Sequence, residues 1–99
     1  MISRLWRGIV RSECASAYIE HLQRETSPAL QRLSGFKRMT ILNRPCELGV
    51  EFLVVTVWAS EEAIVAFAGA DMEAAVVPEK VQRLMVQFDE RARHFNTIE

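Results

Sequence analysis

The stretch VEFLVVTVW, residues 50–58, decides the fold, because its density of β-branched and aromatic side chains predicts a strand. Along a strand the side chains alternate between two faces. Both faces are apolar here: one carries Phe52, Val54 and Trp58, and the other carries Leu53, Val55 and Val57. A sheet with helices on one side and water on the other alternates apolar with polar residues. We therefore expect helices to cover one face and a second copy of the chain to cover the other.

Upstream of residues 50–58, the pattern predicts a strand, a helix and a second strand. Residues 2–10 alternate as a first strand. Ser12 is a suitable N-cap for an amphipathic helix. Pro28 either ends this helix or begins a short second helical turn. Residues 36–43 form the next strand, and we expect a loop of about five or six residues to join it to the decisive strand.

Downstream, a second helix and a final strand are predicted. Ser60 caps the helix, Gly69 stops it, and Asp71 is expected to cap a short helical continuation. Residues 81–88 fit both a helix and a strand, and residues 93–98 form the closing strand.

The order strand, helix, strand, strand, helix, strand indicates the fold class. Right-handed crossovers place both helices on one face of a four-stranded antiparallel sheet, in the ferredoxin-like βαββαβ arrangement. Residues 1–99 suit one α+β domain of ordinary size. The prediction is a single ferredoxin-like domain that works as a homodimer.

Composition argues against several function classes. With a net charge of −1 and scattered Lys and Arg, nothing favours binding to nucleic acid or anionic lipid. No apolar run is long enough for a membrane span, and the first residues lack a secretory signal. Cys14 and Cys46 are interpreted as reduced thiols of a cytoplasmic protein. Acidic residues show no metal-ligand spacing, and no nucleotide or hydrolase motif is present.

Several motifs resemble a known family. They are Met1-Ile2-x-Arg4-x-Trp6-Arg7-Gly8, Phe52-Leu53, Val57-Trp58-x-Ser60-x-Glu62-Ala63-Ile64, Phe67-Ala68-Gly69 and His94-Phe95-Asn96. Together they are similar to the antibiotic biosynthesis monooxygenase-like family over nearly the whole chain. The resemblance implies a dimeric α+β barrel. It leaves the activity open, because members of this family oxidise aromatic polyketides without a cofactor, open haem, act as isomerases or quinol oxidases, or have no assigned activity.

The haem-degrading branch of that family carries a Trp and an axial His from the second helix onward, and an Asn in the first strand. The corresponding positions here are Phe67, Val77, and Trp6 or Arg7. Because a proximal ligand is needed to hold haem iron, we expect no haem. Flavin and metal are likewise not expected.

Candidate catalytic residues follow from the strand order. His94 lies in the predicted last strand, and imidazole is suited to removing a proton from a phenol or enol. The last strand neighbours the first, so Arg4 or Arg7 is expected near His94, where a cation would stabilise an enolate. His21 falls off the apolar stripe of the first helix and is expected to be solvated.

Four aromatic residues are expected to line a substrate pocket between sheet and helices, although each also suits an ordinary core: Trp6, Tyr18, Trp58 and Phe67. The leading hypothesis is a cofactor-independent monooxygenase acting on a small aromatic or enolisable substrate. A non-catalytic dimeric module that binds a small ligand or a partner protein is the first alternative. Isomerase chemistry on the same scaffold is the second.

Overall fold

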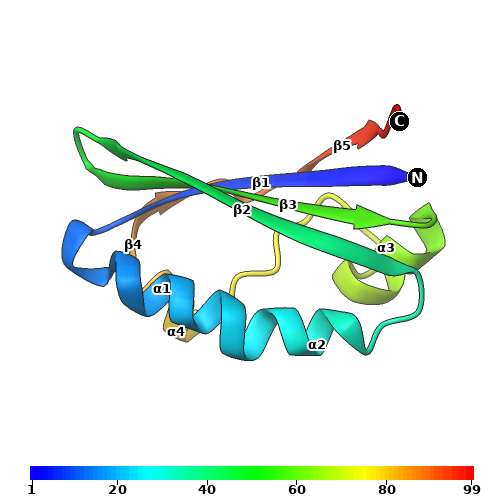
Figure 1. Cartoon of the computed structure of the whole chain (residues 1–99), viewed down its shortest axis with the longest axis horizontal. Helices are drawn as coiled ribbons and strands as arrows, with labels where there is room; N and C mark the ends of the chain where they lie inside the picture. The colour runs from blue at the N-terminus through cyan, green and yellow to red at the C-terminus, as the bar shows by residue number, and fades with distance from the viewer.

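The computed structural model describes residues 1–99. The strand-forming segments of the chain pair into one antiparallel sheet (Figure 1). Its strands are β1 (Ile2–Val10), β2 (Phe36–Cys46), β3 (Gly49–Trp58), β4 (Met85–Phe88) and β5 (Arg93–Asn96). The order across the sheet is β2-β3-β1-β4, and β5 pairs with the other half of the same edge of β1. This mixed α+β architecture confirms the predicted ferredoxin-like fold, with the last strand divided in two.

Pairing between β1 and β3 sets which side chains share a face. Ile2 lies opposite Trp58 and Val10 opposite Val50, without a register shift between them. Arg4 and Trp6 therefore leave the sheet on the same face as the apolar side chain of Phe52.

The helical elements all lie on that face, below the sheet in Figure 1, and no helix covers the upper face. A continuous helical segment consists of η1 (Ser12–Cys14), α1 (Ala15–His21), the π turn η2 (Leu22–Thr26) and α2 (Ser27–Gln31). The shorter helices are α3 (Glu61–Ala68) and α4 (Glu79–Gln82). Ser60 caps α3 by accepting a hydrogen bond from the backbone of Ala63, and Gly69 ends it with a φ of 95°, as the sequence predicts.

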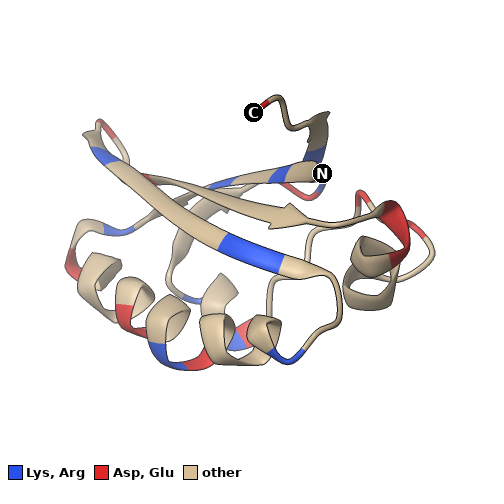
Figure 2. Cartoon of the chain, turned by 45° about the vertical axis from the view of Figure 1, so that its right-hand side comes forward, with Lys and Arg blue, Asp and Glu red and all other residues tan.

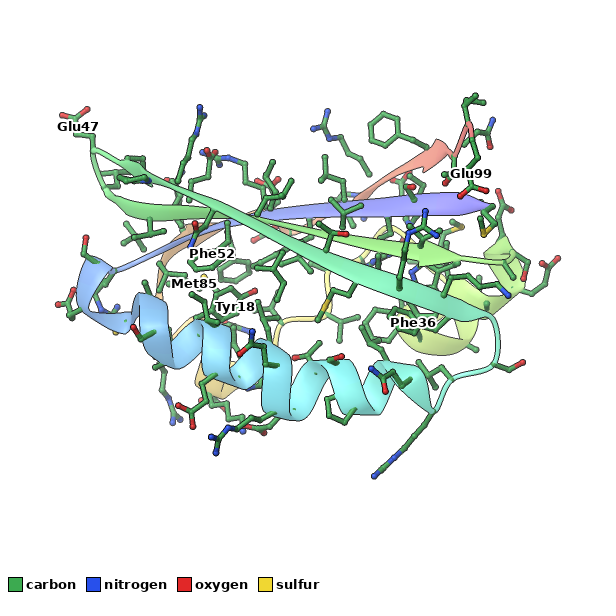
Figure 3. All side chains as sticks on the ribbon, viewed as in Figure 1. Tyr18, Phe36, Glu47, Phe52, Met85 and Glu99 are labelled. Atoms are coloured by element: carbon green, nitrogen blue, oxygen red, sulfur yellow. The ribbon has the colours of Figure 1, made fainter.

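The core fills the space between these two layers. Tyr18, Phe52 and Met85 belong to one buried cluster, and Figure 3 shows all three between the sheet and the long helical segment. A second cluster gathers around Trp58 and Ile64, both fully buried. None of the helices is long and apolar enough to cross a membrane. Figure 2 shows Lys and Arg dispersed over the elements rather than gathered on one of them.

The hairpin between β2 and β3 corrects the predicted loop of five or six residues. β2 continues to Cys46 and β3 begins at Gly49, so the turn is short. Pro45 pairs with Val50 inside the ladder. It is tolerated because β2 is an edge strand, where a missing backbone donor can face solvent.

One expectation in the C-terminal third was also wrong. Asp71 does not begin a helical continuation; it receives two hydrogen bonds from Arg91, at 3.0 and 2.8 Å, and Ala74 forms an isolated bridge with Arg91. The ambiguous residues 81–88 contain both predicted structures, since α4 ends at Gln82 and β4 begins at Met85.

The upper face of the sheet is apolar and open. Leu42 on β2 and Phe95 on β5 each leave 49% of their surface exposed. The one buried carboxylate on this face, Glu51, accepts hydrogen bonds from Arg7 and Arg44, which lower its pKa. The apolar second face predicted for β3 is therefore present and has no helix over it.

Candidate functional site

A small cavity of about 90 Å³ lies between the sheet and the helices. Its walls come from β1, β3, the long helical segment, α3 and the chain around α4. Most lining side chains are apolar, and the polar exceptions are Arg4, Tyr18, His21, Thr26 and Thr56. An apolar enclosure with a few polar groups suits a small organic ligand.

Arg4 gives this cavity a buried positive charge. The residue is only 5% exposed, and its guanidinium lies over the Phe67 ring, 5.6 Å from the ring centroid. It donates to the carbonyl oxygens of Met72 and Ala74, the latter at 2.9 Å, and forms no ion pair with any carboxylate. Burial lowers the pKa of Arg4, but a guanidinium stays protonated in proteins. The cavity wall therefore carries a cation without a fixed counter-ion, which favours a ligand that is or becomes an anion.

His94 stands behind Arg4 rather than at the cavity wall. The two residues pair across β1 and β5, and Nη1 of Arg4 lies 3.0 Å from Nε2 of His94. Because a guanidinium can only donate, Nε2 accepts and Nδ1 carries the proton. Burial, and then the charge of Arg4, lower the pKa of His94 and keep its imidazole neutral. The expected approach of Arg4 to His94 is thus present in the structure.

The expectation that Arg7 could take the place of Arg4 beside His94 was wrong. Successive side chains of a strand point to opposite faces, and Arg7 leaves β1 on the upper face, where it pairs with Glu51. It therefore cannot approach the cavity or His94.

Three of the four expected pocket aromatics lie at the cavity wall: Trp6, Tyr18 and Phe67. Trp6 donates from Nε1 to the carbonyl oxygen of Asp89 at 2.8 Å. Tyr18 packs edge-on against Phe52, with ring centroids 4.9 Å apart, and burial raises the pKa of its hydroxyl. At neutral pH this phenol is protonated and able to donate a hydrogen bond.

Trp58 is not at the wall, contrary to expectation. Its ring is fully buried and stacks on Phe67 with centroids 5.4 Å apart. Its Nε1 donates to Oγ1 of Thr56 at 2.9 Å. Trp58 therefore supports two lining residues, Phe67 and Thr56, from behind.

His21 is the functional candidate that sequence reasoning missed. It lines the cavity, and only 13% of its side chain is exposed, so the expectation of a solvated histidine was wrong. Its ring stacks on Tyr18, and Nδ1 lies 3.3 Å from a carboxylate oxygen of Glu25. The i, i+4 spacing of His21 and Glu25 was the available signal.

A model of the antibiotic biosynthesis monooxygenase family matches residues 1–77. The chain belongs to this family. A search of curated proteins finds no match.

Solved structures share the fold of this family member. A putative antibiotic biosynthesis monooxygenase from Bacillus cereus superimposes with a TM-score of 0.67 at 16% identity, covering 99% of this chain and 91% of that one. The monooxygenase from the gene ActVA-Orf6 of Streptomyces coelicolor, in complex with nanaomycin D, superimposes with a TM-score of 0.69 at 18% identity. The match covers 99% of this chain and 88% of that one. A variant of MhuD, with two manganese protoporphyrin IX molecules bound per active site, superimposes with a TM-score of 0.68 at 20% identity. The match covers 100% of this chain and 96% of that one.

The residues at the expected haem positions do not fit haem. The resemblance to the haem-degrading branch assigns its Trp and axial His to Phe67 and Val77, which line the cavity and offer no ligand to iron. The cavity of about 90 Å³ is also well below the roughly 300–1,000 Å³ of sites for larger ligands.

Proposed function

We propose that this member of the family is a cofactor-independent monooxygenase that acts on a small aromatic or enolisable substrate. The observation that carries the proposal is the position of Arg4 at the cavity wall, 95% buried and without a carboxylate partner. A buried cation lowers the energy of an enolate or phenolate far more than a solvated one would, because the local dielectric is low.

The chemistry requires the substrate to lose a proton and become electron-rich. The resulting carbanion reduces dioxygen, one oxygen atom forms a new bond to carbon, and the other leaves as water. The substrate supplies all four electrons when a CH₂ group becomes a carbonyl, so no external reductant is needed. Arg4 would hold the developing oxyanion, and Trp6 and Phe67 would contact the flat apolar part of the substrate.

For His94 we propose a positioning role in this reaction. The lone pair on its Nε2 already accepts from Arg4, and its Nδ1 is buried without any partner. The imidazole therefore orients the guanidinium toward the cavity, a task that needs an acceptor and not a base.

The upper face of the sheet supports a homodimer. Leu42 and Leu53 border a hollow of about 330 Å³ on this face, which could receive side chains of a second copy. Phe95 extends the same face on the other side of β1. Pairing two such faces would remove the exposed side chains of Leu42 and Phe95 from water.

A non-catalytic ligand-binding module is the second candidate, and the small volume of the cavity favours it. Such a module would bind small phenols or enols without consuming oxygen. An isomerase would turn over its substrate in the absence of oxygen.

Oxygen uptake distinguishes these functions. We expect the wild type to consume oxygen with ethyl acetoacetate or anthrone, each of which has an activated CH₂ group, and the smaller substrate to fit better. Arg4→Met should lower kcat/KM by about 100-fold or more, as loss of an oxyanion donor does. Arg24→Met is the matched control, because Arg24 is exposed and forms only a 3.6 Å pair with Glu20. Binding of these compounds to the wild type without oxygen uptake would contradict the monooxygenase and support the binding module.

A further inference from the structure

His21 is the only imidazole at the cavity wall, because His94 is screened by Arg4. The other ionisable lining groups are unsuited to accepting a proton. Arg4 has only donors, and the burial of Tyr18 keeps its phenol protonated. Imidazole is the side chain that most often takes up a proton in catalysis.

Glu25 fixes which nitrogen of His21 is free. Nδ1 lies 3.3 Å from Oε2 of Glu25, while Oε1 of the same carboxylate accepts from Lys80 on α4. A carboxylate can only accept, so Nδ1 carries a proton and the lone pair of the neutral ring is on Nε2. A histidine oriented in this way by a carboxylate is a common arrangement for a general base.

Two features of the helix hold this ring at the cavity. The π turn η2 begins directly after His21 and places Leu22 and Thr26 at the same wall. Single π turns inside helices occur frequently at functional sites. The ring of His21 also stacks on Tyr18 with 12° between the ring planes, so its orientation is restricted from a second side.

We propose that Nε2 of His21 is the base that removes the substrate proton, with Glu25 as its positioning residue; this inference rests on the proposed function. The substrate C–H or O–H bond breaks, its electron pair stays on the substrate as an enolate or phenolate, and the proton forms a new N–H bond on Nε2. The imidazolium then faces the Glu25 carboxylate on one side, and the anion faces Arg4.

Proton removal can be measured without oxygen. Ethyl acetoacetate is a small enolisable probe, and NMR follows the exchange of its C2 protons for deuterium under anaerobic conditions in D₂O. We expect the wild type to exceed the buffer rate and His21→Gln to lower the enzymatic rate by about 100-fold or more, the range for losing a general base. Glutamine keeps a donor for Glu25 but has no basic nitrogen.

Matched variants separate the base from its surroundings. His94→Gln keeps an acceptor for Arg4 but has no basic nitrogen, so this variant tests whether His94 rather than His21 is the base. Glu25→Gln should lower kcat more than it raises KM, whereas Glu20→Gln, on the same helix and 64% exposed, should change neither. Circular dichroism and thermal unfolding confirm that each variant is folded.

The outcomes are distinguishable. Full exchange in a folded His21→Gln variant overturns the role of His21 and leaves the proposed function standing. Loss of exchange in His94→Gln, but not in His21→Gln, assigns the base to His94 and also overturns the inference. No exchange above buffer in the wild type contradicts both the inference and the proposed function.

Discussion

Arg4 and His94 lie opposite each other on β1 and β5, and the 3.0 Å contact between Nη1 and Nε2 fixes the histidine in its neutral form. Nδ1 of the same ring is buried without a hydrogen-bond partner. An unpaired buried donor costs free energy, so this arrangement is retained at the expense of stability. The pair is most simply explained by a need to orient the guanidinium.

Acid should therefore destabilise the protein through His94. Its pKa in the folded state is below 6.5, so as the pH falls through 6.5 the unfolded chain gains a proton that the folded chain does not. The free energy of unfolding should decrease across this range, above the range in which the carboxylates titrate. His94→Gln should flatten that part of the curve. Urea unfolding measured at steps from pH 7.5 to about 5 tests this linkage; equal slopes for both proteins would contradict it.

Thr56→Val should destabilise the fold although it conserves shape. Oγ1 of Thr56 is the acceptor for the buried Nε1 of Trp58, and valine leaves that donor unsatisfied. The expected loss is about 1–3 kcal/mol of unfolding free energy in urea. Ser34→Ala, in the exposed turn before β2, is the control and should stay within about 0.5 kcal/mol. If the two substitutions cost the same, the hydrogen bond is not the cause.

Gly8→Ala should act on the cavity through Trp6. A Cβ at position 8 would lie 2.6 Å from Cη2 of Trp6 and 3.2 Å from Sδ of Met85, so the indole must move. Overpacking of this kind costs roughly 1–3 kcal/mol. Because Phe is smaller than Trp, the cost should fall in the Trp6→Phe background. A double-mutant cycle by urea unfolding measures the difference, and additive costs would rule out the clash.

Leu42→Glu should dissociate the proposed homodimer. Leu42 is 49% exposed on the open face of the sheet, and a carboxylate there would lose its hydration in a paired face. Light scattering coupled to size exclusion should give a dimer for the wild type and a monomer for the variant. Val65→Glu places the same charge on α3, at a residue 39% exposed on the helical side, and should remain dimeric. A monomeric wild type at micromolar concentration would remove the basis for this proposal.

Local sequence signals were sufficient for most of the fold. Neighbouring residues alone predict the strand β3, the start of α3 at Ser60 and its end at Gly69. The division of the last strand is different. Its break leaves β4 and β5 to pair separately with β1, and it is stabilised by long-range contacts, such as the bond from Asp89 N to Arg7 O. No pattern within residues 85–96 marks these contacts.

The candidate site was predictable only in part. The neighbourhood of Arg4 and His94 follows from the order of strands, which places the last strand beside the first. The position of His21 does not, because this residue flanks the apolar stripe of α1, and the stripe alone does not show that its ring stacks on Tyr18, three residues earlier. Trp58 was misplaced because an aromatic residue in a strand fits a core and a pocket equally well.

The π turn at Leu22–Thr26 also has a consequence for how related chains align. A π turn holds one more residue than the corresponding α-helical turn, so relatives with a regular helix should show a one-residue gap here. Straightening this turn into a regular α-helix without removing a residue would rotate all that follows by about 100°. Leu30, buried on the same face as Tyr18 and Leu22, would then turn away from its cluster with Trp58. The π turn therefore keeps both ends of this helical segment packed against the sheet.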